Sequence, residues 1–524
     1  MSGYLRRLAT TGAAYTAASI VSKLIAVALL PLYTRYLSPT DYGAAEVLFV
    51  AVVSASIVIR LGVIEALLRF YYKDDEDPDR VVSTSFAALF WFATAAALIA
   101  LPFAEPISEA LFDARNMEIL AEHGESAPDL VRIAIGGLWV ATLHEYLLTI
   151  FRLEERARAF FVTTMLNVFA AIGLTVALIV GADEGARGLL LGSYVSGAAI
   201  VLVLIVVHRR RLSLWIDRSL LRRLMRFGLP TMPAELSLYM LNFVDRIIIV
   251  RTIGLAEAGL YSLAVKFAQA VNVLVRGFQL AWPPLAYSIR DDDEARRTYA
   301  AVVTWFVAAC SFVVVGIWLL ARWIVRALAA PEFFDAFEAI GPIAAGVTLY
   351  ALYMVLVVIL GRTGRTEFNF PATAAALVAN VALNLILVPP LGIVGAGIAL
   401  VASYLVVLAL MYGFTQRLFP VPYEWSRLAR IVAVSAALVG LGEALLPAEG
   451  AGGLLARIVL WLVYPLALLA TGFFSPDERA WLAGLRHPRD LLHRLRTAQA
   501  APTAVDGRIP ETYEAELADE DARL

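Results

Sequence analysis

The chain has 524 residues, of which 60% are hydrophobic, and its mean hydropathy is +0.75. Soluble domains contain about 45–50% apolar residues, so the composition excludes a soluble globular protein. We predict an all-α polytopic membrane protein, because long apolar runs cross a bilayer as helices. The formal net charge of −2 points to no charged partner, and no nucleic-acid partner is expected.

Apolar runs of about 20 residues, long enough to cross a bilayer, follow one another along the chain. In the first half they lie near 10–34, 43–68, 81–102, 130–151, 160–181 and 188–207. In the second half they lie near 228–250, 257–283, 299–321, 337–360, 368–388 and 392–414, and two more lie near 429–446 and 454–473. The sequence therefore predicts about fourteen transmembrane helices, the first retained rather than cleaved as a signal peptide.

These runs form two six-helix lobes joined by a basic connector. The predicted divisions are 1–207 for the N-terminal lobe, 208–227 for a cytoplasmic connector, 228–415 for the C-terminal lobe, 416–474 for two further helices and 475–524 for a cytoplasmic tail. The tail begins with arginines among leucines, which is typical of a helix on the membrane surface. It ends polar and acidic, which predicts partial disorder.

An internal repeat relates the two lobes. One constant shift pairs Leu5-Arg6-Arg7-Leu8 with Leu221-Arg222-Arg223-Leu224, Gly12 with Gly228, Arg35 with Arg251, Asp41 with Glu257, Gly43 with Gly259 and Arg60 with Arg276. Each copy has a double arginine, a spanning run, a turn with an acidic residue before glycine, and a second run. Each copy is therefore expected to be a transmembrane helical hairpin.

The side on which arginine falls predicts the orientation. Most loop arginines fall on one side, with Arg187, Arg322 and Arg326 as the clearest exceptions. The longest loop on the other side, Phe103 to Asp129, is acidic and contains the single cation Arg115. By the positive-inside rule, both termini are expected in the cytoplasm.

Four cations fall at membrane depth. Lysine occurs only as Lys23, Lys73 and Lys266, and two of these lie inside spanning runs, as do Arg60 and Arg276. Because each charge near a helix centre costs about 2.5–3.5 kcal/mol, we expect these cations to face a wet cavity or an anion. The alternatives are internal salt bridges and, for Arg60, a side chain that reaches back to the interface.

Acidic residues are scarcer in the spanning runs. Asp245 and Glu235 lie in the seventh run and are either pairing partners of a buried cation or sites for a coupling proton or sodium ion. Glu46, near the outer end of the second run, is expected to be solvated. The single cysteine, the five scattered histidines and the lack of a phosphate-binding loop or a His-Glu-x-x-His motif predict no metal, no cofactor and no ATP-driven pump.

The segment Tyr36-Leu37-Ser38-Pro39-Thr40-Asp41-Tyr42-Gly43 resembles the corresponding turn of the bacterial polysaccharide flippases of the O-antigen and exopolysaccharide pathways. These proteins share a superfamily with the multidrug-and-toxin extruders and the lipid II flippases. The resemblance extends over about residues 1 to 475. It implies two six-helix lobes and a final helix pair that move an undecaprenyl-diphosphate-linked oligosaccharide from the cytoplasmic to the periplasmic leaflet of the inner membrane by alternating access.

The resemblance also implies roles for residues. Family cavities are cationic and lined by helices one, two, seven and eight, so Lys23, Arg60, Lys266 and Arg276 would hold the diphosphate while the lipid tail stays in a groove. A proton or sodium gradient would drive the cycle, and polysaccharide polymerase machinery would be a partner.

Two other functions compete with the flippase. A multidrug or cation antiporter of the same superfamily would favour an acidic or aromatic cavity, and the buried lysine and arginine argue against it. A polysaccharide polymerase-type membrane enzyme would need a catalytic cluster on an outer loop, whereas the loop from Phe103 to Asp129 shows only helix-like spacing. We therefore expect a transporter rather than an enzyme.

Overall fold

The computed structural model describes residues 21–22, 25–72, 77–365, 368–474 and 478. Every regular element within these ranges is a helix, which confirms the predicted all-α class. The chain divides into two compact units, Met1–Tyr464 and Pro465–Leu524, and the contacts that form the fold lie within the first unit. The lobe boundaries at 207, 227 and 415 stay predictions.

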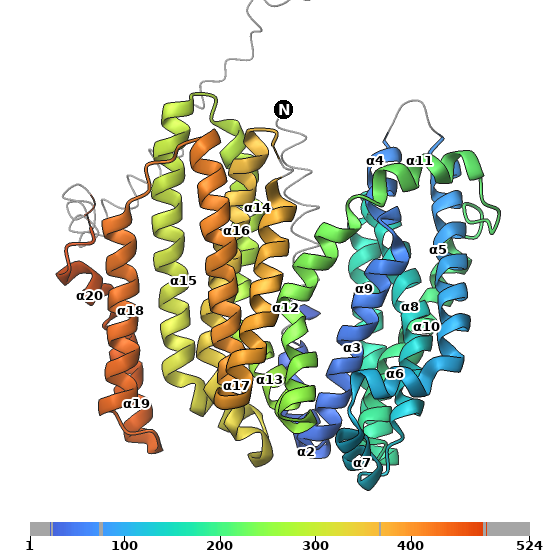
Figure 1. Cartoon of the computed structure of the whole chain (residues 1–524), viewed down its shortest axis with the longest axis horizontal. Coiled ribbons are helices and arrows are strands. Elements are labelled where there is room, and N and C mark those ends of the chain that lie inside the picture. The colour runs from blue at the N-terminus through green and yellow to red at the C-terminus, as the bar shows by residue number, and fades with distance from the viewer. Residues whose placement is uncertain (1–20, 23–24, 73–76, 366–367, 475–477, 479–524) are drawn as a thin grey trace, which may run out of the picture. The chain divides into compact units, whose positions relative to one another are not determined.

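The first half of the chain, up to the connector, is built from α2 to α10 (Figure 1). Its elements are α2 Leu30–Tyr36, α3 Pro39–Arg60, α4 Val63–Phe70, α5 Pro78–Ala100, η1 Leu101–Phe103, α6 Ala104–Leu111, α7 Ala114–Glu122, α8 Ala127–Leu153, α9 Ala157–Val176, η2 Ala177–Gly181 and α10 Gly185–His208. The connector contains α11 Arg218–Gly228.

The second half consists of α12 to α17, and three short helices follow it. These elements are α12 Met232–Thr252, α13 Leu255–Ala268, α14 Val271–Ser288, α15 Asp292–Leu328, η3 Pro331–Ala336, α16 Phe337–Arg362, α17 Asn369–Leu418, α18 Trp425–Leu445, α19 Gly450–Leu462 and α20 Tyr464–Ala470. The long α17 contains the non-helical residue Gly392, which separates the two runs predicted there.

Three predicted runs are wrong as single helices, among them 454–473, which is divided between α19 and α20 at Val463. The run 43–68 is divided between α3 and α4 because Leu61 and Gly62 are left-handed, with φ of 48° and 70°. A Cβ on Gly62 would lie 1.9 Å from the carbonyl oxygen of Gly228, so the backbones touch at this bend. The run 257–283 is divided between α13 and α14 at Gln269 and Ala270, where the sequence has neither glycine nor proline to signal a break.

The predicted turn with an acidic residue before glycine is also shorter than expected. α2 ends at Tyr36, and α3 already begins at Pro39, so Asp41 and Gly43 belong to the helix. Ser38 caps it: the Ser38 hydroxyl oxygen accepts from the Asp41 N–H at 3.1 Å, and Asp41 Oδ2 accepts from the Ser38 N–H at 3.3 Å. This reciprocal capping box explains the Ser-Pro-x-Asp sequence physically.

Among the described residues, nine helices are long and apolar enough to span a membrane, or ten if α19 and α20 form one span. The predicted number of about fourteen spanning helices is higher than this count for identifiable reasons. The first run falls largely outside the described residues, α12 carries several charges, α13 and α14 are separate, and α17 counts once although it replaces two runs. The number fourteen therefore stays a prediction.

The two halves meet along α3 and α13, which the internal repeat relates. A Cβ on Gly43 would lie 2.1 Å from the Leu255 carbonyl oxygen, and a Cβ on Gly259 would lie 2.1 Å from that of Pro39. The repeat pairs Gly43 with Gly259 and Pro39 with Leu255, so equivalent residues contact each other reciprocally across the seam. Only glycine allows two helix backbones this close.

An ion pair crosses the same seam. Lys266 Nζ on α13 donates to Glu46 Oε1 on α3 at 2.5 Å. Their side chains are 30% and 12% exposed, so neither charge is fully solvated. The expectation that Glu46 is solvated is therefore wrong: α3 points it at α13 rather than at water.

The predicted acidic loop forms α6 and α7, and these helices fasten the α12–α13 turn. The Asn116 side-chain amide donates to the Val250 carbonyl oxygen at 2.9 Å and accepts from the Leu255 N–H at 3.1 Å. Arg251 donates to the carbonyl oxygens of Glu109, at 3.0 Å, and Ala110. A loop of the first half therefore holds a turn of the second half.

The connector helix α11 packs beside α4, at the end of the first half opposite α6 and α7 (Figure 1). Asp217 caps α11 by accepting from the N–H groups of Ser219 and Leu220. Hydrogen bonds from the Ser219 hydroxyl, the Leu220 N–H and Arg80 lower the pKa of Asp217. A folded helix within 208–227 was not predicted.

Gly43→Ala is expected to destabilise the protein by about 1–3 kcal/mol, because the new methyl group forces α3 away from α13. Gly136→Ala on α8 is the control, since its Cβ would meet nothing within 4 Å and the helix gains about 0.5–1 kcal/mol. Thermal unfolding of the detergent-purified proteins measures both. A Gly43→Ala protein that melts at or above the wild-type temperature would contradict the close seam.

Lys266→Met alone is expected to cost about 3–5 kcal/mol, because it leaves Glu46 buried without a cation. The double variant Glu46→Gln, Lys266→Met should recover most of that loss, since both charges disappear together. Unfolding free energies of the wild type, both single variants and the double variant form the required cycle. Strictly additive effects would mean that the two side chains do not form a pair.

Candidate functional site: membrane cations and an apolar groove

Arg60, the last residue of α3, is buried between helices of both halves. Its Nη1 lies 3.1 Å from Glu145 Oε2 on α8, and its Nη2 donates to Glu235 Oε1 on α12 at 3.0 Å. The arginine side chain is 6% exposed, whereas those of Glu145 and Glu235 are 52% and 36% exposed. Arg60 is thus a buried cation that is shared by two solvent-accessible carboxylates.

Asp245 is fully buried on α12 and is held by α13. Its Oδ2 accepts from the Tyr261 hydroxyl, and its Oδ1 accepts from the Arg246 N–H at 2.9 Å. The neighbouring Arg246 side chain donates from Nε to Ser262 Oγ at 2.9 Å. The carboxylate oxygens of Asp245 therefore both have donors, an arrangement typical of structural pairing.

Arg276 differs from these charges because it is exposed. Among the described residues, its Nη1 donates to Gln279 Oε1 on its own helix, at 3.4 Å. Together with Phe278, Trp282 and Tyr350 it lines a cavity of about 260 Å³ between α14 and α16. A cation in this cavity is available to an anion from outside the protein.

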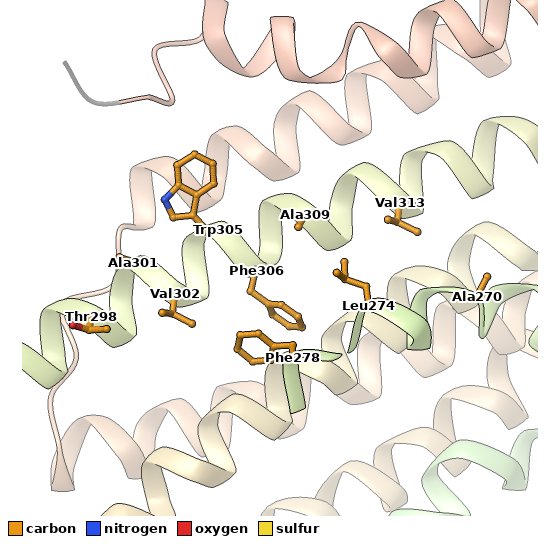
Figure 2. A pocket seen from close by; sticks show the side chains of 10 residues that line it. All are labelled: Ala270, Leu274, Phe278, Thr298, Ala301, Val302, Trp305, Phe306, Ala309 and Val313. Atoms are coloured by element: carbon orange, nitrogen blue, oxygen red, sulfur yellow. The ribbon is translucent and has the colours of Figure 1, made fainter. Parts of the chain in front are cut away.

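A large apolar groove lies beside that cavity, between α14 and α15 (Figure 2). It measures about 990 Å³ and is lined by Ala270, Leu274, Phe278, Thr298, Ala301, Val302, Trp305, Phe306, Ala309 and Val313. The rings of Phe278 and Phe306 stack with centroids 4.0 Å apart. Phe278 lines both the groove and the Arg276 cavity, so an apolar space and a cationic one adjoin.

The predicted site residues have distinct surroundings. Arg60 and Glu235 are brought together, Lys266 is paired with Glu46 and lies 4.7 Å from the Tyr42 ring centroid, and Arg276 faces a cavity. Lys23 lies outside the described residues. The contacts of Arg60, Lys266 and Arg276 do not join these three cations into a single cluster.

Sequence reasoning missed Glu145. Its signal was present, because it is the one carboxylate within the apolar run 130–151. The described residues contain no group of three or more histidine, cysteine or acidic side chains that could hold a metal ion.

Comparisons with known proteins concern the family and the fold of the chain. The family model described as "Polysaccharide biosynthesis protein" matches residues 8–286. The chain is 26% identical to the "Succinoglycan biosynthesis transport protein ExoT" of Rhizobium meliloti (strain 1021) over 326 residues, which cover 60% of this chain. The chain spans 61% of the length of that relative.

Two solved transporter structures share the fold. One is "Lipid II flippase MurJ, inward closed conformation", with a TM-score of 0.67, 15% identity, and coverage of 86% of this chain and 97% of that one. The other is the inward-facing conformation of a multidrug resistance MATE family transporter of the MOP superfamily, with a TM-score of 0.61, 18% identity, and coverage of 76% and 94%. With a family model that matches just over half of its length, this multi-pass membrane chain belongs to the polysaccharide biosynthesis protein family and has the fold of the MurJ and MATE transporters.

Proposed function

We propose that this protein is a lipid-linked oligosaccharide flippase. It moves undecaprenyl-diphosphate-linked repeat units from the cytoplasmic to the periplasmic leaflet of the inner membrane by alternating access of its two halves, with both termini in the cytoplasm. The observation that carries the proposal is the exposed Arg276 in a cavity that adjoins a large apolar groove. A lipid diphosphate has the same two parts, an anion and an apolar tail.

The Arg276 cavity suits the diphosphate. Its guanidinium has no carboxylate partner among the described residues, so an entering phosphate displaces water rather than an internal anion. Arginine binds phosphate oxygens through paired N–H donors and keeps its charge when desolvated. Lys23, Arg60 and Lys266 complete the proposed set of cations, the last two after their present carboxylate partners are displaced.

The groove suits the prenyl tail. It contains Phe278, Phe306 and Trp305 (Figure 2) and shares Phe278 with the Arg276 cavity, so a tail in the groove brings its diphosphate to the cation. Apolar contact there replaces contact with lipid, so the groove positions the substrate more than it adds affinity.

Ion coupling is assigned to Glu235 or Asp245. Glu235 is 36% exposed and bonded to Arg60, so water can bring it a proton or sodium ion. Asp245 is fully buried and accepts a hydrogen bond from Tyr261, so it is the weaker candidate for ion coupling.

A multidrug or cation antiporter is disfavoured, because Arg276 repels a cation at the cavity that adjoins the groove. The curated relative is described as a transport protein, which agrees with a transporter rather than a polymerase-type enzyme.

Arg276→Ala is expected to lower flipping by tenfold or more, because it removes the cation that receives the diphosphate. Lipid-linked oligosaccharide on each leaflet is measured in cells that lack the native protein and express each variant at equal level. Arg276→Lys should keep part of the activity. The control Arg326→Ala removes an arginine bound to the 71%-exposed Glu449 side chain and should flip normally. Normal flipping by Arg276→Ala would rule out this anion site.

Ala301→Phe and Ala309→Phe are expected to lower flipping of a long-chain substrate, because each fills part of the groove on α15. A substrate with a shortened prenyl chain should be affected less. The control Ala436→Phe adds the same ring to an exposed position on α18. Equal losses for long and short chains would show that the substitutions act on folding rather than on the tail.

A further inference from the structure

Arg60 is shared by carboxylates from opposite halves of the protein. Glu145 belongs to α8 in the first half, and Glu235 belongs to α12 in the second. Each takes one terminal nitrogen of the guanidinium, at 3.1 Å and 3.0 Å, while Nε is buried with no partner among the residues that the structure describes. Two separate carboxylates therefore occupy the two nitrogens that a phosphate group would use.

The charges of this cluster do not balance. Two carboxylates face one guanidinium. The two carboxylates repel each other while they share one positive charge, so each interaction with Arg60 is weaker than that of an isolated pair. Both carboxylates are exposed enough to return to water, whereas Arg60, at 6% exposure, stays in place. An arriving anion would thus displace the carboxylates and not the cation.

We propose that Glu145 is a specificity-determining residue of the anion site. Glu145 and Glu235 both bind Arg60, and only a ligand with two negative charges, such as a diphosphate, displaces both of them. A monoanion can replace one carboxylate but leaves the other in place, whereas a diphosphate replaces both and keeps the guanidinium fully bonded. This inference rests on the proposed function, because it concerns how the same site selects its substrate.

Displacement of Glu235 from Arg60 also links substrate binding to movement of the two halves. Glu235 fastens the beginning of α12 to the end of α3, close to the contact between Gly62 and Gly228. Displacement of Glu235 by a diphosphate releases that fastening, while Glu145 joins Arg60 only to its own half. Glu145 therefore acts on selectivity, and Glu235 acts on both selectivity and the contact between halves.

The test measures binding of two probes, inorganic diphosphate and the monoanion dimethyl phosphate, to the full-length protein in nanodiscs by calorimetry. The wild type should prefer diphosphate strongly. Glu145→Gln should bind dimethyl phosphate about tenfold tighter, about 1.4 kcal/mol, and should lose much of the preference. Glu145→Asp retains the charge and should keep the preference of the wild type.

Matched variants separate the effect from general changes in charge or folding. Glu118→Gln removes an exposed carboxylate on α7 and should leave both affinities unchanged. In Arg60→Ala, further addition of Glu145→Gln should have no effect on binding, because the shared cation is gone. Equal melting temperatures of Glu145→Gln and the wild type exclude unfolding as the cause.

Two outcomes would overturn the inference in distinguishable ways. If the wild type binds diphosphate through Arg60 but Glu145→Gln keeps the same preference, Glu145 only holds the arginine in place and the proposed function stands. If diphosphate binding depends on neither Arg60 nor Arg276, the anion site of the proposed function is lost as well.

Discussion

Burying charge in a bilayer costs about 2.5–3.5 kcal/mol for each residue even on insertion scales, and this cost determines where the polar side chains lie. Arg60 and Lys266 both have carboxylate partners on other helices. Arg457, which is 1% exposed on α19, obeys the same rule through Glu443 on α18, at 2.7 Å. Arg276 is the contrasting case: it lines a cavity and has no carboxylate partner in the described part of the chain. The need to neutralise charge therefore separates cations that hold helices together from one left available to a ligand.

The seam between α3 and α13 allows the Lys266–Glu46 pair to form across the two halves. Gly43 and Gly259 let the backbones touch, and the contact is reciprocal because the two residues are repeat-related. Self-complementary contacts of this kind are usual between identical subunits. Here they occur within one chain, with the Lys266–Glu46 pair added on one side only. The backbone contact is symmetric, and the charges on it are not.

The sequence was sufficient for the fold class and for much of the repeat. Hydropathy located most of the long apolar helices of the described residues, and the repeated glycines proved to face each other, although no pattern said that they would touch. The break at Gln269 was missed because no glycine or proline accompanies it. The partners of Arg60 were missed because helical periodicity predicts which face a residue occupies, not which helix lies opposite. Glu145 is 85 positions from Arg60, and only the packed structure brings them together.

The repeat also explains why two equivalent arginines differ. Arg60 and Arg276 are related by the same shift, which pairs Glu235 of the second copy with Ser19 of the first, so the repeat gives Arg276 no counterpart of the Glu235 carboxylate. Arg60 is consequently occupied by internal anions, and Arg276 is open to its cavity. A duplicated hairpin has thus produced one occupied and one free guanidinium. In the alternating-access cycle that we propose, the anion contacts Arg276 first, because no carboxylate of the described residues has to be displaced there, and then competes for Arg60.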